Sequence, residues 1–196
     1  MLGWVRDFIT QPHPDLESGN PESKKVVCPF MPGSLELGLT WFALASDPIR
    51  SPVDVIDALA KYKDLIKSIP PTSGREARYK TIIVVFPMVS SEAASEFIDG
   101  VHGKVAGEYR ADGLMLGEFH PGNGKCGAHN PAFFPLRSPV PAMAVRLMVA
   151  RDHVFLAKDS GDPLKDLENA KAYGDAMNAM DPPPSQSPRA ARGHRP

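Results

Sequence analysis

The run Thr81–Phe86 (TIIVVF) constrains the fold of this chain more than any other segment. It is apolar and largely β-branched at both odd and even positions, so both faces of the corresponding strand would be buried. A strand of this kind lies in the middle of a sheet and is covered on both sides. We therefore expect a domain built around a small sheet, with Val84 in its core.

Three other segments have the signals of helices. Ser51 and Pro52 fit an N-cap and a first helical residue, and apolar residues recur in steps of three and four at positions 55, 59, 62, 66 and 69. A second helix begins at Ser90 or Ser91, and its apolar stripe comprises Ala94, Phe97, Ile98, Val101 and Val105. A last helix opens at Asp162 and Pro163, and it would bury Leu164, Leu167, Ala170, Tyr173 and Met177.

Two further segments read as strands, and one is ambiguous. Leu35–Ala45 is apolar enough for a buried strand, and Leu114–Phe119 predicts a third strand. Met143–Val149 alternates well enough for a strand, but Pro139 and Pro141 before it suit the start of a helix, which we expect here. The pattern predicts an α+β domain, or an α/β one, with about three or four strands packed against helices.

Composition sets the limits of this domain and of its partners. A chain of 196 residues suits a single globular domain over residues 1–180, followed by a disordered Pro- and Arg-rich tail at 181–196. A net charge of −1 argues against nucleic-acid binding, and two cysteines exclude a disulfide framework and a four-Cys zinc site. No apolar run reaches the ~20 residues that span a bilayer, and the N-terminus has no secretory signal. We expect a cytoplasmic protein with a small-molecule ligand and no membrane partner.

The chemistry is expected in the segment 117–137 (GEFHPGNGKCGAHNPAFFPLR), which follows the third strand. Loops of this length inside a compact domain are uncommon and are often functional. Ligand sites also lie at the ends of strands in α/β sheets. We therefore expect this loop to build a pocket.

A metal is one candidate occupant of this loop. Cys126 and His129 have the spacing C-x-x-H, and His120 could supply a third ligand. Such a set would leave an open coordination position for a substrate or water. The alternative is a turn-rich loop with ordinary hydrogen-bonded histidines, and the spacing alone favours this alternative.

Haem and phosphate are two other candidates. Cys28, before Pro29, and His120, before Pro121, are residue types that serve as axial haem ligands, and the walls of a haem pocket would be Phe30, Met31, Phe119, Phe133 and Phe134. The stretch PGNGKCG could turn its backbone N–H groups and Lys125 towards an anion, although it matches no known phosphate loop. Phosphate ranks below the metal.

Acid–base chemistry needs no cofactor. Glu118 stands two residues before His120, so both side chains would leave a continuing strand on the same face and could act as an acid and a base. Arg137 and Arg146 could clamp a carboxylate or phosphate, and Cys126 could pair with a histidine as a nucleophile. We expect Arg137 to share a cavity with His120, where its charge would keep the imidazole neutral.

Three stretches together carry a resemblance to a known family: VVCPFMPGSLELGLTWF, GLMLGEFHPGN and LRSPVPAMAVRLMVARDHVFL. They resemble an uncharacterised family of bacterial domains of unknown function, found in actinobacteria and among their natural-product gene sets. The resemblance covers residues 28–156 and brings no established activity. It implies that one recurring pattern joins Cys28, Pro29, Phe30, Phe119, His120, Pro121, Arg137, Ser138 and Pro139.

These observations favour an enzyme that binds a small molecule at the 117–137 loop, and the resemblance implies a place in bacterial secondary metabolism. His120, Arg137 and Glu118 are the candidate catalytic residues, Cys28 is a candidate cofactor ligand, and a transition metal or haem is a candidate cofactor. A non-catalytic accessory or binding protein is the alternative, in which the same loop contacts a partner.

Overall fold

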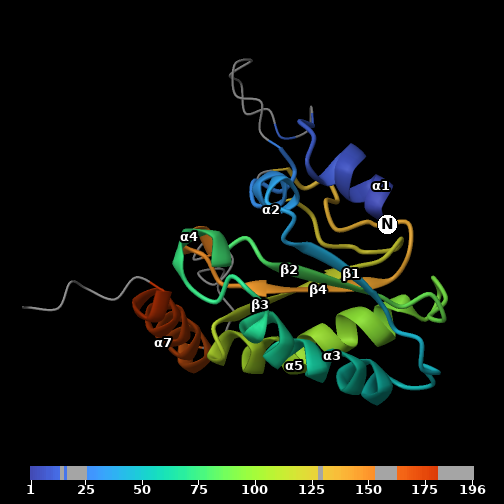
Figure 1. Cartoon of the computed structure of the whole chain (residues 1–196). Coiled ribbons are helices and arrows are strands. Elements are labelled where there is room, and N and C mark those ends of the chain that lie inside the picture. The colour runs from blue at the N-terminus through green and yellow to red at the C-terminus, as the bar shows by residue number, and fades with distance from the viewer. Residues whose placement is uncertain (14–15, 17–25, 128–129, 153–162, 181–196) are drawn as a thin grey trace, which may run out of the picture.

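The computed structural model describes residues 1–13, 16, 26–127, 130–152 and 163–180, and these form a single α+β domain around a four-stranded sheet (Figure 1). The strand order is β1-β2-β4-β3, where β1 runs parallel to β2 and β4 is antiparallel to both of its neighbours. The strands are β1 (Thr40–Leu44), β2 (Thr81–Val85), β3 (Leu114–Phe119) and β4 (Ala142–Leu147).

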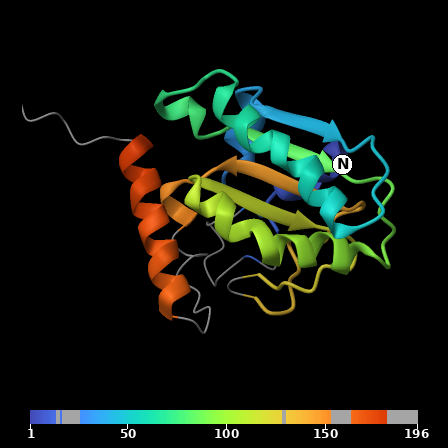
Figure 2. The ribbon, with the colours of Figure 1, turned by 90° about the horizontal axis from the view of Figure 1, so that it is seen from below.

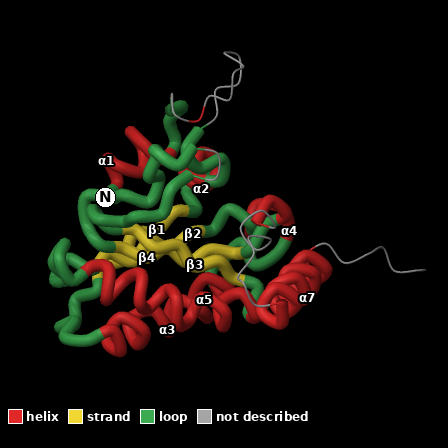
Figure 3. The backbone as a smooth tube through the Cα atoms, turned by 180° about the vertical axis from the view of Figure 1, so that it is seen from behind, coloured by secondary structure: helices red, strands yellow, loops and turns green. Residues whose placement is uncertain are grey.

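Helices lie on both faces of this sheet, as Figures 1 and 3 show. One face is covered by α3 (Pro52–Ser68), by the π-helix η3 (Ser95–Asp99) and by α5 (Gly100–Ala111). The other face carries α1 (Leu2–Trp4), η1 (Val5–Ile9) and α2 (Met31–Glu36). At one end of the sheet lie α4 (Gly74–Ala77) and α7 (Pro163–Met180), and a short 3-10 turn, η4 (Ala150–Asp152), follows β4.

The central strand β2 confirms the prediction from the run Thr81–Phe86. All of its residues are buried, and its side chains alternate between two apolar clusters. Ile82 and Val84 belong to the larger cluster, which α3 and α5 complete, whereas Ile83 and Val85 belong to the smaller cluster with residues of η1 and α2. The strand is apolar on both sides because it is packed on both sides.

The helix α3 begins where the sequence predicts. Ser51 and Asp54 form a capping box, in which the Asp54 carboxylate accepts from the Ser51 backbone N–H at 2.8 Å. The apolar stripe is buried at Val55, Leu59, Tyr62 and Ile66. The second predicted stripe also packs inward, since Ala94, Ile98, Val101 and Val105 are buried, but it runs through η3 before α5 begins.

The helix expected over Met143–Val149 is wrong, because this segment forms β4 in the middle of the sheet. Its alternation decides the structure: Met143 and Val145 pack against the helices of the larger cluster, and backbone pairs form with β2 and β3. The prolines do not begin a helix here. The carbonyl oxygen of Pro141 instead accepts from the Phe86 N–H at 2.9 Å, which extends the sheet contact by one residue.

Two smaller expectations are corrected as well. The strand expected over Leu35–Ala45 is limited to β1, because its first residues complete α2 and Gly38 then reverses the chain at a φ of +66°. The helix α7 begins at Pro163 as predicted, but it leaves Leu164 and Leu167 71% and 68% exposed. It rests on α5 through polar contacts such as the one between Arg110 and Asn169, so it lies outside the core.

Among the described helices, none combines the length and the apolar character that crossing a bilayer requires. The predicted tail at 181–196 lies outside the described residues.

Candidate functional site

The carboxyl end of β3 presents two polar side chains to the helical layer. Leu114 and Leu116 face the larger apolar cluster, and the alternation of the strand then turns Glu118 to the same side. His120, the first residue after β3, keeps this alternation. Only 3% of Glu118 and 1% of His120 is exposed. The two side chains therefore lie on one face, as their spacing predicts.

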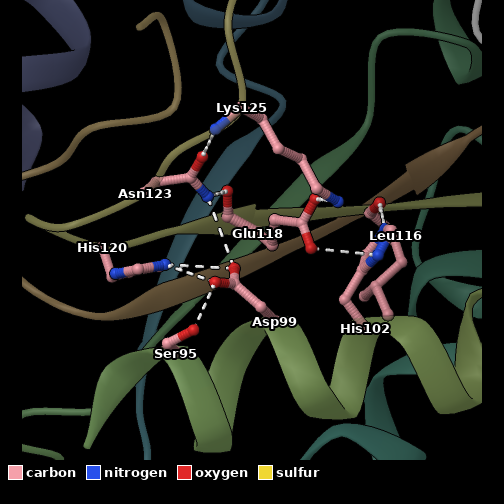
Figure 4. A network of polar contacts seen from close by, with 8 residues as sticks. All are labelled: Ser95, Asp99, His102, Leu116, Glu118, His120, Asn123 and Lys125. Atoms are coloured by element: carbon pink, nitrogen blue, oxygen red, sulfur yellow. Dashed lines mark hydrogen bonds and ion pairs between the residues drawn. The ribbon is translucent and has the colours of Figure 1, made fainter.

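Their partners come from η3 and α5. Asp99 is the last residue of η3 and His102 lies in the first turn of α5, so a three-residue step brings both side chains to the helix surface that faces β3 (Figure 4). A π-helix at this point is notable, because π-helical turns are rare and occur frequently at functional sites.

Glu118 is held between His102 and Lys125. Its Oε2 lies 3.0 Å from Nδ1 of His102, and its Oε1 forms an ion pair with Nζ of Lys125. Burial acts to raise the pKa of the Glu118 carboxyl, but the contacts with His102 and Lys125 outweigh it and leave the pKa below its ordinary value. Glu118 is therefore an ionised, paired carboxylate, which does not suit the part of a general acid at neutral pH.

His102 completes this cluster by contacting oxygen atoms on both sides of its ring. Nε2 lies 3.0 Å from the carbonyl oxygen of Leu116, which can only accept, while Nδ1 faces the Glu118 carboxylate. Nε2 donates to this carbonyl oxygen when it carries a proton. The ring thereby fastens α5 to β3 beside the second polar pair.

The second pair is formed by His120 and Asp99. Nε2 of His120 lies 3.0 Å from both Oδ1 and Oδ2 of Asp99, so it donates its hydrogen to the carboxylate. Asp99 also accepts from the Ser95 hydroxyl at 3.1 Å. Nδ1 of His120 is buried and has no hydrogen-bond partner among the described residues. In the neutral form of the ring, a proton on Nε2 leaves a lone pair at Nδ1, and this lone pair can accept a proton or bind a metal.

The loop after β3 folds back over this pair. Asn123 is fully buried, its backbone N–H donates to the His120 carbonyl at 3.2 Å, and its side-chain oxygen accepts from the Lys125 N–H at 2.9 Å. Its side-chain nitrogen lies 3.5 Å from Oδ1 of Asp99. A Cβ atom on Gly122 would stand 3.7 Å from Nδ1 of His120, so the glycine backbone runs alongside the bare nitrogen.

Arg137 lies close to this loop but on its outer side. Its Nε donates to the Asn123 carbonyl at 3.1 Å, and its guanidinium lies 4.0 Å from the centre of the Phe134 ring. The N–H of the next residue, Ser138, donates to the His120 carbonyl at 3.3 Å. The structure thus brings the two chain segments together, while it places the Arg137 guanidinium at the surface and the His120 imidazole in the interior.

The other candidate residues are not gathered here. Cys126 is exposed, His129 lies outside the described residues, and no cluster of three or more metal-ligating side chains occurs in the part of the chain that is described. Cys28 is partly buried in the smaller apolar cluster, on the face of the sheet opposite the His120 ring. Arg146 is engaged with buried Asp152 at 2.5 and 2.7 Å, so its guanidinium supports the fold.

Sequence reasoning missed the partners of these residues. It assigned no part to Asp99, His102, Ser95 or Asn123, although Asp99 and His102 stand one helical turn apart at a predicted helix that follows a strand. A signal was available in the pairing of D-x-x-H on that helix with E-x-H on the next strand. Each motif is short, and only the packing of α5 on β3 joins them.

Comparisons with known proteins agree with the resemblance read from the sequence. No curated protein matches the chain, and no solved structure matches it. A family model described as a domain of unknown function (DUF6875) matches residues 1–181. Because the match covers more than half of the chain, the protein belongs to the DUF6875 family.

Proposed function

We propose that the protein binds a small molecule at the carboxyl end of β3 and acts on it as an enzyme, with His120 as general base. The observation that carries this proposal is the bare Nδ1 of His120, which is buried without a partner among the described residues. A buried polar atom that lacks a partner costs about 1–3 kcal/mol. Such atoms are rare in folded proteins, and each one calls for an explanation such as a catalytic part.

The Asp99 carboxylate supports this part for His120. It fixes the proton on Nε2 and therefore directs the lone pair to Nδ1, and it would stabilise the imidazolium that forms when Nδ1 takes a proton. A general base of this kind contributes about 10²–10⁴-fold to a rate. Asp99 acts through His120 and is a positioning residue.

Access to Nδ1 requires the loop beside it to move. Gly122 lies along the imidazole edge, and Gly124 follows two residues later, so this part of the loop has backbone freedom that other residues lack. Arg137, on the outer side of the same loop, would hold an anionic group of the ligand, because guanidinium pairs bidentately with carboxylates and phosphates. The ligand we propose is a small molecule with an acidic group and a removable proton.

A transition metal is the second candidate for Nδ1, and one observation favours it. Histidines that bind metals usually donate their other ring N–H to a carboxylate, which is the arrangement of His120 and Asp99. Cys126 and His129 are the further ligands we would propose. The assignment to bacterial secondary metabolism rests on the sequence resemblance alone, and haem with Cys28 as ligand finds no support in the placement of Cys28.

The test uses purified full-length protein and a fixed panel of small carboxylic acids, phosphate esters and amines. Amide resonances of residues 117–127 report binding by NMR, and mass spectrometry reports conversion. At least one compound is expected to bind and to be converted, and His120→Gln should lower the conversion by about 100-fold or more. Lys104→Gln, an exposed change on α5, is the matched control.

Each other outcome contradicts a defined part of the proposal. Binding without conversion would refute the enzyme and leave a binding protein. Conversion that survives His120→Gln would refute the base, and the absence of binding at residues 117–127 would refute the site. Metal analysis and an absorbance scan of the same sample test the metal, and a colourless, metal-free protein would refute it.

A further inference from the structure

A cavity of about 190 Å³ lies at the opposite end of the sheet from His120. It opens beside the amino end of β2, where Leu147 of β4 pairs with Leu114 at the start of β3. In Figures 1 and 3 this is the end of the sheet at which α4 and α7 lie. The cavity is therefore independent of the proposed active site. Its walls are Lys67, Thr72, Ser73, Gly74, Ala77, Arg78, Lys80 and Leu147.

The charged residues of this lining are all cations. Lys67 comes from the end of α3, Arg78 follows α4, and Lys80 directly precedes β2. The hydroxyl groups of Thr72 and Ser73 add neutral donors. Among the described acids, Asp112 is the nearest to Lys67, with 3.5 Å between its Oδ1 and the Lys67 Nζ. Asp112 also pairs with Nζ of Lys63 at 2.6 Å, and neither Asp112 nor Lys63 lines the cavity.

Lys80 is the most unusual member of the lining. Only 1% of the residue is exposed, and among the described residues its ammonium donates to one acceptor, the Ile69 carbonyl oxygen, at 2.9 Å. An ammonium group has three N–H donors, and burying a charge without full compensation is costly. Burial accordingly lowers the pKa of Lys80. An anion in the cavity would supply the missing acceptors.

We propose that this cavity is a binding site for a small tetrahedral oxyanion, namely phosphate or the phosphate group of an ester, held by Lys67, Arg78 and Lys80. Three cations from separate segments can contact different oxygens of one tetrahedral anion. The cavity is smaller than the ~300–1,000 Å³ of sites for drug-sized molecules, so it suits a group of few atoms. The rim hydroxyls of Thr72 and Ser73 would bind the remaining oxygens.

The test is a titration of ¹⁵N-labelled full-length protein with sodium phosphate, followed through the amide resonances of residues 72–80. Glycerol phosphate in a parallel titration distinguishes a phosphate ester from free phosphate as the tighter ligand. Sodium chloride and sodium acetate at equal ionic strength control for screening. We expect saturable shifts with phosphate or its ester, and only small linear shifts with the two control salts.

Three variants test whether the lining residues are responsible for phosphate binding. Lys80→Met keeps the side-chain length without the charge, and it should raise the Kd about tenfold or more. Lys67→Met should have a similar effect; its side chain is 41% exposed, so this variant remains informative if Lys80→Met does not fold. Arg75→Met, on the exposed side of α4, is the matched control and should leave the Kd unchanged.

Any one of four results would overturn the proposal. Chloride could produce the same saturable shifts, which would indicate general screening. The Kd could be equal in the wild type, Lys67→Met and Lys80→Met, or Arg75→Met could weaken binding as much as they do, which would indicate a diffuse cationic surface. The residues 72–80 could also fail to respond to either phosphate compound.

Discussion

His120 and Asp99 are 21 positions apart in the chain, yet Nε2 of His120 lies 3.0 Å from both carboxylate oxygens of Asp99. The contact joins the carboxyl end of β3 to the π-helix that precedes α5. It directs the lone pair of a buried imidazole towards the loop of Gly122, and the chemistry proposed for this protein depends on that direction.

The first prediction concerns the tautomer of His120. In the wild type we expect the proton on Nε2 and the lone pair on Nδ1, because the Asp99 carboxylate can only accept. Asp99→Leu should release this constraint and lower any activity by about 10–100-fold, as is usual when the orienting partner of a histidine is removed. Long-range ¹H–¹⁵N NMR of the imidazole nitrogens measures the tautomer. A wild-type ring protonated only at Nδ1 would contradict the prediction.

The second prediction concerns the stability that Glu118 supplies. Glu118→Gln leaves His102 and Lys125 without their carboxylate. Because the Lys125 side chain is 55% exposed, we expect the free energy of unfolding at pH 7 to fall by only about 1–2 kcal/mol. The folded-state pKa of Glu118 is depressed, so its contribution is present above the ordinary value of 4.5 and is lost as the pH falls through the folded pKa. The difference between variant and wild type should therefore shrink in acid.

Urea denaturation at pH 7 and at pH 3 measures this difference. Glu108→Gln is the matched control, since Glu108 is an exposed glutamate of α5. A loss of stability that is equal at both pH values would show that packing, and not charge, accounts for the effect of Glu118→Gln.

The third prediction concerns the cost of burying Lys80. Its folded-state pKa lies below the ordinary 10.5, so the folded protein binds this proton less readily than the unfolded chain does. Stability should therefore rise as the pH increases through the folded pKa towards 10.5. At pH 7, in buffer without phosphate, Lys80→Met should raise the Tm by a few degrees, since about 1 kcal/mol corresponds to ~2–4 °C at this size.

Calorimetry of Lys80→Met beside Lys104→Met, an exposed change on α5, measures this effect. A fall in Tm for Lys80→Met alone would mean that the hydrogen bond to Ile69 outweighs the cost of desolvation.

The fourth prediction concerns the central strand. Val84 is fully buried in β2, so Val84→Asp should abolish soluble folding, because an unpaired carboxylate in the core costs several kcal/mol. Leu44→Asp makes the same kind of change at a β1 position that is 67% exposed, and it should leave the protein soluble. The soluble fraction and circular dichroism report the outcome. A soluble Val84→Asp variant with a cooperative melting transition would contradict the position of β2.

Local periodicity was sufficient for much of the fold. The stripe of α3 and the doubly apolar run of β2 were predicted correctly, because both patterns follow from geometry within one element. The same rule correctly predicted that Glu118, in β3, and His120, directly after it, turn their side chains to one face. Where two rules competed, at Met143–Val149, alternation outweighed the nearby prolines, since the backbone of that segment pairs with strands on both sides.

The candidate site was less predictable, because its partners are distant in sequence. Asp99 and His102 meet their partners only when the helical layer packs on β3, and the D-x-x-H spacing alone does not identify the strand that they contact. Arg146 was also a misleading candidate. Its guanidinium could clamp an anionic ligand, but it is already paired with the buried carboxylate of Asp152. The prediction that the leucines of α7 are buried was wrong for a related reason. A periodic apolar stripe does not show whether another element is available to cover it.

The connection between β3 and β4 carries the proposed site, but it does not set the pairing of the two strands that it joins. Adjacent antiparallel strands can be joined by as few as two residues, yet here the chain uses residues 120–141. The register of the two strands is set by their own ladder of backbone pairs, from Leu114 with Leu147 to Phe119 with Ala142. A change in the length or sequence of this connection should therefore alter the surroundings of His120 while it leaves the backbone pairs of the sheet in place.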